Sequence, residues 1–411
     1  MGKPEIRFKG YTDEWEQRKL GDLVDRVTRK NQDLVSELPL TISAQYGLID
    51  QNEFFDKRVA SKDVSGYYLI ENGEFAYNKS TSTDAPWGAI KRLDRYKNGV
   101  LSTLYIVFGI KENNPVDSDF LVSYYSTNLW HKGIHEIAAE GARNHGLLNI
   151  APADFFETKL MIPQDIEEQK KIGKYFEELE RLITLHQRKC DEVKSLKKYM
   201  LQKMFPQNEQ KVPEIRFEGF TEAWEQRKLI EVCDYVDYRG KTPTKTENGI
   251  FLVTAKNVKD GFIDYETSKE YISENAYEEV MRRGKPEIGD VLITTEAPCG
   301  NVAQVNKADI ALAQRIIKYR GHIGVVDNTY LKYYLLSPEF QKILNAKSSG
   351  GTVQGIKGSI LHQQKIIYPS YEEQKKIGQH MDSLDHLITL HQQKCEELKK
   401  IKKFMLQKMF V

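Results

Sequence analysis

The chain is an internal duplication, and this feature constrains its fold more than any other. KPEIRFKGYTDEWEQRKL at 3–20 returns as VPEIRFEGFTEAWEQRKL at 212–229. Three later segments also recur, namely EEQKKIG at 167–173 and 372–378, LITLHQ at 182–187 and 387–392, and MLQKMF at 200–205 and 405–410. Each half therefore has the same order of opening segment, middle region and closing segment, so we expect one fold used twice.

The two middle regions differ far more than the ends, but their landmarks keep the same order. NGEFAYN at 72–78 resembles IGDVLIT at 288–294, and APWG at 85–88 resembles APCG at 297–300. Short β-rich runs alternate with Asn-Gly and Asp-Gly turns and with helical stretches, which predicts an α+β domain of about 150 residues in each half. The contrast indicates ends with a shared structural role and middles that each recognise something different, although loop drift after duplication gives the same contrast.

The closing segments predict two long helices. From about 166 to 205 the sequence lacks proline, and apolar residues recur at alternating steps of four and three, as they do in the second copy. A seven-residue repeat sustained over about five heptads is typical of a coiled coil. Because each helix has a single apolar stripe, we expect the two helices to pack on each other around a pseudo-two-fold axis. The pattern allows both parallel and antiparallel packing.

We place the domain boundaries where each helical segment begins and ends. The first α+β domain then occupies 1–162 and its helix 163–206. The second α+β domain occupies 207–368 and its helix 369–411.

Composition excludes several classes of protein. Lys and Arg number 60 against 59 Asp and Glu, for a net charge of +1. This balance argues against a protein that coats nucleic acid non-specifically, but it allows sequence-specific binding by local patches. No stretch approaches the roughly 18 apolar residues of a membrane span, and the 4 cysteines are widely spaced. We therefore expect reduced thiols, a cytoplasmic protein and no membrane partner.

No set of residues specifies catalysis. RGKT at 239–242 resembles the end of a phosphate-binding loop, but Tyr235 stands where that loop requires its first glycine. Asp154, Glu157 and Lys159 superficially resemble the acidic pair and lysine of a metal-dependent nuclease, but the second copy lacks the carboxylates. We predict no catalytic residues and no cofactor bound by this chain.

Two histidine and cysteine pairs on the predicted helices have two interpretations. His186 and Cys190 are four residues apart, and their copies are His391 and Cys395. If the helices crossed near their midpoints, the four side chains could form a tetrahedral zinc site. As seam residues, the cysteines would be small apolar fillers and the histidines polar groups that fix the register. We favour the seam interpretation and predict no metal ion.

Polar loops in both middle regions carry side chains that suit DNA recognition. Arg and Lys can pair with guanine, Asn and Gln with adenine, and Ser and Thr with phosphate or base edges. Ordinary solvated loops have a similar composition, but these clusters fall at matching places in both copies with different side chains. The candidates in the first copy are Ser43, Gln45, Tyr46, Lys79, Ser80, Thr81, Ser82, Arg143, Asn144 and His145, and those in the second copy are Arg239, Lys241, Thr242, Lys256, Asn257, Thr294, Thr295, Arg315, Ser348, Ser349, Thr352 and Gln354.

Almost the whole chain resembles the specificity subunit of type I restriction-modification systems, in particular its Staphylococcus-like form. The residues responsible are PEIRF with WEQRKL and their copies, the P-x-x-x-E-E-Q-K-K-I-G element that begins at Pro163 with its copy around Pro369, and LQKMF at the end of each half. The resemblance implies that each middle region is a target-recognition domain for one half of a bipartite DNA sequence. It also implies that the helices form an antiparallel coiled coil, which sets the length of the unspecified spacer.

The resemblance also implies the partners. The subunit of this family is not itself an enzyme, and it docks two modification subunits, which bind S-adenosylmethionine and methylate adenine. Restriction subunits, which use ATP with Mg²⁺ and cleave DNA, join the complex. We therefore expect a non-catalytic reader of double-stranded DNA, with the cofactors in its partner subunits. A coiled-coil adaptor that binds proteins in place of DNA is the alternative from another class, and a stand-alone enzyme is the weakest hypothesis.

Overall fold

The computed structural model describes residues 2–43, 46–83, 85–112, 114–138, 143–144, 147–207, 210–238, 243–350 and 354–411, with backbone only at 143–144. The chain divides into two compact units, the first comprising Met1–His186 with Lys394–Val411 and the second Gln187–Gln393. Each unit thus combines one middle domain with the first part of its own long helix and the last part of the other copy's helix. Each unit is described by itself.

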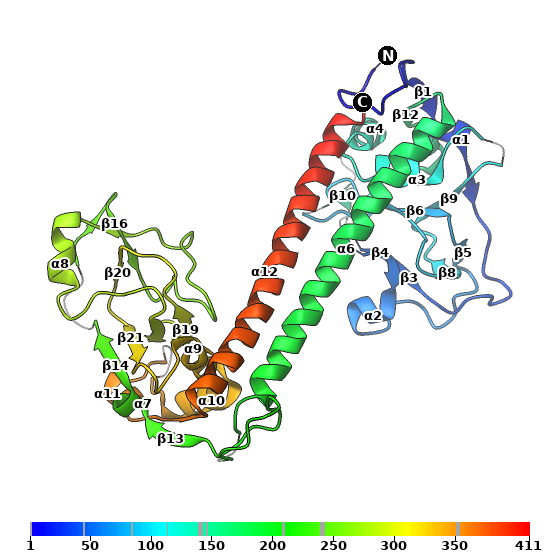
Figure 1. Ribbon diagram of the computed structural model, residues 1–411. Coiled ribbons are helices and arrows are strands. Elements are labelled where there is room, and N and C mark those ends of the chain that lie inside the picture. Colours follow the sequence, from blue (N-terminus) through cyan, green and yellow to red (C-terminus); the bar gives the residue numbers. More distant parts are fainter. Residues whose placement is uncertain are drawn as a thin grey trace. The chain divides into compact units, whose positions relative to one another are not determined.

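The first half of the chain contains a mixture of short strands and helices that ends in one long helix (Figure 1). Its elements are β1 (Glu16–Lys19), α1 (Leu20–Leu23), β2 (Val24–Val27), β3 (Leu40–Ser43), β4 (Gly47–Asp50), α2 (Gln51–Phe55), β5 (Tyr68–Glu71), β6 (Phe75–Asn78), β7 (Ala89–Arg92), β8 (Asn98–Leu101), β9 (Ile106–Ile110), α3 (Ser118–Tyr124), α4 (Trp130–Ile137), β10 (Arg143–Asn144), β11 (Leu147–Leu148), α5 (Pro152–Phe156), β12 (Lys159–Ile162) and α6 (Ile166–Lys203).

The second half repeats this order with changes in the connecting elements. Its elements are β13 (Glu225–Lys228), α7 (Leu229–Val232), β14 (Cys233–Asp237), β15 (Lys245–Thr246), β16 (Ile250–Val253), β17 (Tyr271–Ile272), the 3₁₀ helix η1 (Glu274–Ala276), α8 (Tyr277–Val280), β18 (Val291–Thr295), β19 (Cys299–Gln304), β20 (Ile310–Leu312), β21 (Ile316–Gly321), α9 (Asn328–Leu336), α10 (Pro338–Lys347), α11 (Gly358–His362), β22 (Lys365–Tyr368) and α12 (Tyr371–Lys408).

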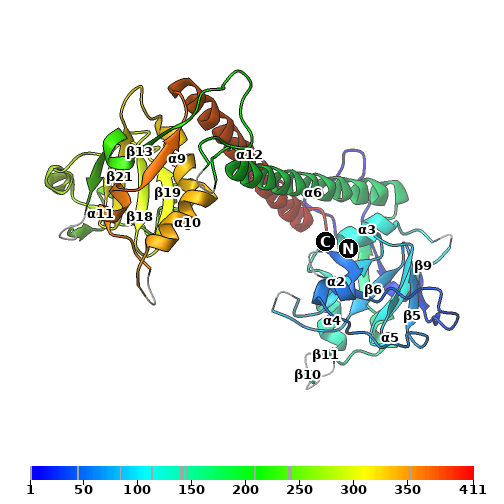
Figure 2. The ribbon, with the colours of Figure 1, turned by 90° about the horizontal axis from the view of Figure 1, so that it is seen from below.

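The same antiparallel four-stranded sheet forms the centre of both units. Its strand order is β2-β9-β6-β7 in the first unit and β14-β21-β18-β19 in the second. The registers also correspond, since Ala76 faces Lys91 in one sheet and Leu292 faces Ala303 in the other. Figure 2 shows α9 and α10 beside the sheet that contains β18, β19 and β21. The predicted α+β fold with an internal repeat is confirmed.

The smaller sheets differ between the units. The first unit has the separate pairs β3-β4 and β5-β8, whereas β15, β17, β16 and β20 form one sheet in the second. The opening segments, in contrast, behave identically, because β1 pairs with β12 and β13 with β22 just before each long helix. The sheets that differ in strand pairing are therefore those that lie apart from the β1-β12 and β13-β22 pairs.

The closing segment of each half completes the core of the other half's unit. In the first unit the Phe410 ring lies 6.0 Å from that of Trp15, and Phe120 lies 5.8 Å from the same indole. In the second unit Phe205 lies 5.6 Å from Tyr330, which contacts the matching Trp224. The identical LQKMF sequences are explained by this reciprocal packing.

The helix segments within the first unit run antiparallel. Glu180 of α6 forms an ion pair with Lys402 of α12. Further along α6, the carbonyl of Ile183 meets the thiol of Cys395, which lies earlier in α12, at 4.0 Å. Residue numbers rise along one helix as they fall along the other, as the resemblance implied.

The second unit repeats this antiparallel contact. The Cys190 thiol meets the Ile388 carbonyl at 4.0 Å, and Lys197 pairs with Asp385. Both Cys190 and its copy in the first unit are buried, as expected of seam residues. Among the described residues, no group of three or more His, Cys, Asp or Glu is placed to hold a metal ion.

A buried ion pair joins each opening segment to the start of a long helix. In the first unit Arg7 donates from Nε and Nη2 to the two carboxylate oxygens of Glu168, at 2.6 and 2.7 Å. In the second unit Arg216 donates to Glu373 in the same bidentate way, at 2.7 and 2.8 Å. The arginine of PEIRF and the second glutamate of EEQKKIG are therefore partners in both copies.

The glutamine of EEQKKIG joins the long helix to the α+β domain. Gln169 donates to the carbonyl groups of Pro115 and Pro163 and accepts a hydrogen bond from the Asp117 amide. Gln374 makes the same contacts in the second unit, including one from Asp327. The two aspartates cap α3 and α9, so these glutamines hold α3 against α6 and α9 against α12.

The glycine of EEQKKIG lies where α3 or α9 approaches the long helix closely. A Cβ at Gly173 would lie 2.7 Å from the Phe120 nitrogen and the Asp119 carbonyl carbon, both backbone atoms. A Cβ at Gly378 would lie 3.1 Å from a Thr329 side-chain carbon and 3.2 Å from the Tyr330 nitrogen, distances that a shift of a few tenths of an ångström relieves. The two glycines therefore differ in how much space surrounds them.

We expect Gly173→Ala to destabilise the first unit more than Gly378→Ala destabilises the second. Overpacking costs about 1–3 kcal/mol, whereas alanine returns up to about 1 kcal/mol of helix propensity. Gly378→Ala should therefore change the free energy of unfolding by less than about 1 kcal/mol. Urea denaturation, with hydrogen exchange to locate the change, measures both effects. An equal or larger loss for Gly378→Ala would contradict this account.

Candidate nucleic-acid interface

In each unit an antiparallel bridge joins two loops. One follows an inner strand of the central sheet, β6 or β18, and the other is rich in glycine. Ser80 bridges Leu147 in the first unit, and Glu296 bridges Gly355 in the second. The alignment of NGEFAYN with IGDVLIT places Ser80 and Glu296 at the same position. We call these segments the bridged loops, which comprise 79–83 with 147–148 in the first unit and 295–297 with 348–350 and 354–356 in the second.

The bridged loops of the second unit enclose a polar hollow of about 460 Å³. Three predicted DNA-contacting residues, Thr295, Arg315 and Ser349, line it together with Glu296 and Lys357. Arg315 Nε lies 3.4 Å from the Glu296 carboxylate, and both side chains are exposed. A guanidinium carries five N–H donors, so this pairing leaves donors for a base edge or a phosphate.

The walls of this hollow are set by backbone hydrogen bonds. The Thr295 amide donates to the Arg315 carbonyl at 2.8 Å, and the Ile356 amide donates to the Thr295 carbonyl at 2.9 Å. Arg315 adopts a left-handed φ of 75°, which is uncommon for a residue with a long side chain. The surrounding hydrogen bonds thus hold the arginine in a conformation that the local sequence does not favour.

The bridged loops of the first unit contain the predicted residues Lys79, Ser80, Thr81 and Ser82. The Leu148 amide donates to the Lys79 carbonyl at 3.0 Å, which ties the two loops together. The Lys79 ammonium group donates to a backbone carbonyl at 3.4 Å, and its burial lowers its pKa below the ordinary value. Ser82 accepts a hydrogen bond from the Ala85 amide at 3.1 Å. Lys79 therefore supports the loop, while Ser80 and Ser82 are exposed.

Other predicted residues lie on separate loops. Tyr46 is 63% exposed on the β3–β4 turn, where its amide donates to the Ser43 hydroxyl at 3.2 Å. Lys256 and Gln354 are exposed in the second unit. Gln45, His145, Arg239, Lys241, Thr242 and Thr352 lie outside the described residues, and Arg143 and Asn144 are described only as the backbone of β10.

Two of the predicted DNA contacts, Asn257 and Thr294, lie in the interior of the second unit. Both side chains are 0% exposed. Asn257 accepts from the Thr254 amide at 2.8 Å and donates to the Asp264 carbonyl at 2.9 Å, while the Thr294 hydroxyl accepts from the Asn301 amide at 3.0 Å. Their polar groups form hydrogen bonds with backbone groups of the protein, so the two side chains stabilise the loops from the interior.

Ser348 also has a structural role at the end of α10. Its hydroxyl donates to the Leu344 carbonyl at 2.8 Å, and its amide donates to the same carbonyl at 2.9 Å. Its neighbour Ser349 is exposed and lines the hollow. Sequence reasoning missed Glu296 and Lys357 because it considered donors for bases and not the carboxylate that orients one of them. The alignment of Glu296 with Ser80 was the available signal.

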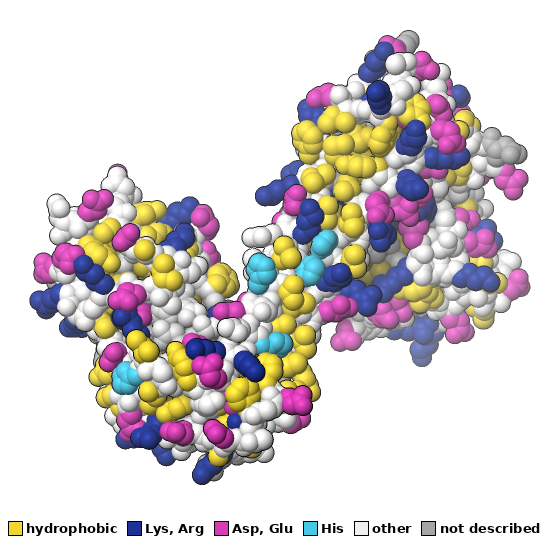
Figure 3. All heavy atoms as spheres, viewed as in Figure 1, with side chains coloured by type: hydrophobic (Ala, Val, Ile, Leu, Met, Phe, Trp, Pro, Cys, Tyr) yellow, Lys and Arg dark blue, Asp and Glu magenta, His cyan; other side chains and the backbone are white. Residues whose placement is uncertain are grey.

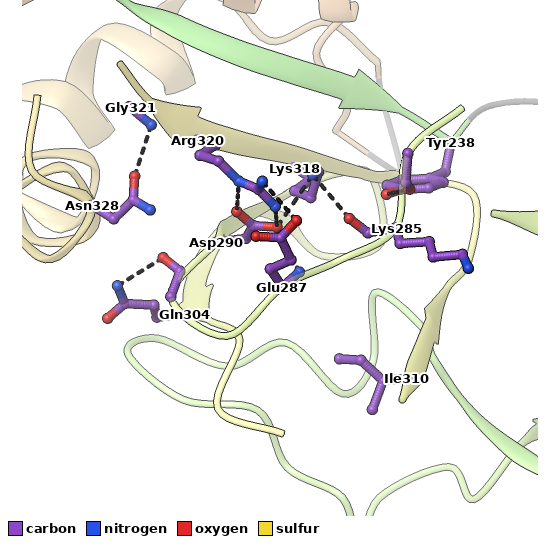
Figure 4. A network of polar contacts seen from close by, with 12 residues as sticks. Tyr238, Lys285, Glu287, Asp290, Gln304, Ile310, Lys318, Arg320, Gly321 and Asn328 are labelled. Carbon is purple, nitrogen blue, oxygen red and sulfur yellow. Dashed lines mark hydrogen bonds and ion pairs between the residues drawn. The ribbon is translucent and has the colours of Figure 1, made fainter. Parts of the chain in front are cut away.

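A buried polar network lies beneath Tyr238, the last described residue before the predicted contacts at 239–242 (Figure 4). Arg320 donates to both oxygens of the buried Asp290 at 2.6 and 2.8 Å, and Lys318 lies 3.2 Å from the same carboxylate. Tyr238 donates through its hydroxyl to the Gly284 carbonyl, and Lys318 donates to the nearby Lys285 carbonyl. These contacts thus hold Tyr238, which directly precedes the predicted DNA contacts at 239–242.

The Asp290 carboxylate stays ionised in this network. Burial alone would raise the pKa of Asp290, but hydrogen bonds from Arg320 and the Glu287 amide, with the charge of Lys318, outweigh burial and lower it. On the face seen in Figure 3, basic and acidic side chains are interspersed over both units, in keeping with the net charge of +1. Local sites, and not the overall field, must therefore attract a nucleic acid.

Comparisons with known proteins assign the family. The profile described as "Type I restriction modification DNA specificity domain" matches residues 12–195 and 221–400. The MjaVIII specificity subunit, a type I restriction enzyme protein of Methanocaldococcus jannaschii, is 24% identical over 408 residues, which cover 95% of this chain and 91% of that protein. The MjaIX specificity subunit of that organism is 31% identical over 184 residues, or 43% of this chain and 41% of that protein.

Solved structures show the same fold. The crystal structure of a type I restriction-modification S subunit from M. genitalium superposes with a TM-score of 0.62 at 14% identity, covering 100% of this chain and 99% of that chain. A chain from a structure of type I restriction-modification complex assembly gives a TM-score of 0.50 at 19% identity, covering 97% and 98%.

The chain therefore belongs to the family of type I restriction modification DNA specificity domains. It is a tandem member of this non-catalytic family, with one recognition domain in each half. The resemblance inferred from the PEIRF, EEQKKIG and LQKMF elements is confirmed, and DNA target recognition is favoured over the protein-adaptor alternative. No helix among the described residues is long and apolar enough to cross a membrane.

Proposed function

We propose that each recognition domain reads one half of a bipartite DNA target and that the paired helices set the spacer between the halves. The observation that carries this proposal is the pair of bridged loops. They occupy the same position on the same sheet in both units, yet Lys79 and Ser80 in one correspond to Thr295 and Glu296 in the other. Constant placement with different side chains is expected of two readers of different sequences.

We also propose that the long helices dock two modification subunits. Three pairs of exposed apolar side chains occupy matching positions of α6 and α12, namely Leu185 and Leu390, Leu196 and Ile401, and Tyr199 and Phe404. Apolar residues that recur on a surface mark interaction sites, and a duplicated set suits two copies of one partner. Restriction subunits would join this assembly, with S-adenosylmethionine and ATP with Mg²⁺ bound by the partners and not by this chain.

The test is DNA binding by the chain assembled with its cognate modification subunits, on a genomic duplex that the complex methylates. We expect tight binding that weakens steeply with salt, because each neutralised phosphate contributes about −0.9 to the slope of log K against log salt. A complex that neither methylates nor binds DNA, while the chain still captures protein partners, would contradict the proposal and favour the adaptor.

A further inference from the structure

A second and larger hollow, of about 760 Å³, lies within the first unit between the recognition domain and the helix pair. Its lining is basic, with Lys91 from β7 on one side and Lys399, Lys402 and Lys403 from α12 on the other. Glu180 is the one carboxylate among its described lining residues. Because Glu180 pairs with Lys402 and Glu396 pairs with Lys399, Lys91 and Lys403 leave an excess of positive charge around the hollow.

Lys91 is the most informative of these residues. It is half-buried on β7, and within the described part of the chain it has no hydrogen-bond or ion-pair partner. Burial, followed by repulsion from Lys402, lowers the pKa of Lys91 below its ordinary value, although the charge of Glu180 opposes this shift. A half-buried ammonium group that forms no hydrogen bond or ion pair is costly, and an anion in the hollow would reduce that cost.

The second unit has no such lysine at this place. The register of the two sheets puts Ala303, which is fully buried, at the position of Lys91. Lys197, the copy of Lys402, pairs with Asp385, which also accepts a hydrogen bond from Tyr333 at 2.6 Å. The unpaired lysine is therefore a property of the first unit and not a requirement of the fold.

The hollow adjoins the bridged loops of the first unit. Ala85 and Gly88, which belong to the same β6–β7 connection as Ser80 and Ser82, line its edge. A duplex whose bases meet that connection would bring its sugar-phosphate backbone to the neighbouring lysines. Lysine is a point charge that suits phosphate, and polar groups of Ser126 and Asn128 at the edge can add hydrogen bonds.

We propose that this basic hollow holds backbone phosphates of the DNA half-site read by the first domain. The proposal rests on the proposed function, since it names a second contact to the same DNA. Phosphate contacts fix the orientation of a protein on the duplex without selecting bases. The first unit would therefore grip its half-site more strongly than the second, and the two half-sites would contribute unequally to affinity.

The test compares the assembled complex carrying Lys91→Ala and Lys403→Gln with the unmodified complex. Lys198→Gln is the matched control, because Lys198 is the copy of Lys403 on α6 and is exposed. The fold accommodates alanine at the position of Lys91, as Ala303 shows. We expect the slope of log K against log salt to fall by about 0.9 for each phosphate that the variant no longer neutralises, with the methylated motif unchanged.

An unchanged slope and affinity in the double variant would overturn the proposal, provided that the unmodified complex shows steep salt dependence. Dissociation of a modification subunit with unchanged DNA binding would also overturn it, because the hollow would then hold an acidic segment of a protein. A salt-independent unmodified complex would instead refute the proposed function itself. A control variant that lowers the slope as much as the double variant would show that the effect is not specific to the hollow, and would overturn the proposal.

Discussion

Exchange of residues 21–158 for the corresponding region of another family member changes one half of the methylated motif and leaves the other half and the spacer as they were. The exchange points suit this experiment because they meet in space. The Leu20 amide donates to the Thr158 carbonyl at 2.8 Å, so the exchanged region begins and ends at one place. β1, β12 and the two long helices, which we propose set the spacer, stay unchanged.

The second unit provides the matched exchange. Its Leu229 amide donates to the Gln364 carbonyl at 2.9 Å, so residues 230–364 form the equivalent region. Exchange of this region should change the other half of the motif. Mapping of methylated adenines in cells that carry each hybrid chain gives the result. A hybrid that alters both halves, or the length of the spacer, would show that the domains do not read independently.

Glu168→Gln should destabilise the first unit by about 3–5 kcal/mol, because it leaves the Arg7 guanidinium in a largely buried position without its charged partner. The Glu168 side chain is 1% exposed, and it accepts both hydrogen bonds from Arg7. Urea denaturation of the full chain measures the decrease in the free energy of unfolding. Hydrogen exchange should locate it in the first unit and leave the Glu373 region of the second unchanged.

The neighbouring Glu167 provides the control for this prediction. It is exposed, and within the described part of the chain its ion pair is with Lys170 one turn away, so Glu167→Gln should cost less than about 0.5 kcal/mol. The double variant Arg7→Met with Glu168→Leu should regain much of the stability, since apolar replacement of a buried ion pair is often neutral. Equal destabilisation by Glu167→Gln and Glu168→Gln would refute the structural role assigned to the pair.

The repeat, the α+β class and the paired helices could be predicted because they depend on near-identical segments and on a seven-residue period. The residues that those segments contact within the folded chain could not be predicted. Arg7 and Glu168 are 161 residues apart, and nothing local to either predicts their contact. The packing of Phe410 into the first unit likewise requires the antiparallel direction, which the apolar pattern left open.

The candidate interface was predicted only in part. The sequence identified Thr295, Arg315 and Ser349 as polar loop residues, and the fold brings them to one hollow. It also selected Asn257, whose side chain satisfies backbone groups, because asparagine serves internal turns and DNA contacts equally well. Lys91 was not among the predicted contacts, because a lysine in a short strand is expected to be exposed. The helices that partly cover it become evident only in the folded structure.

The most direct test of the central claim is a map of N6-methyladenine in a host that expresses this chain with its cognate modification subunit. Two readers held at a fixed separation predict one motif made of two specified halves around a spacer of constant length and free sequence. Absence of methylation, or methylation in a single uninterrupted motif, would contradict the assignment of the two domains as separate half-site readers.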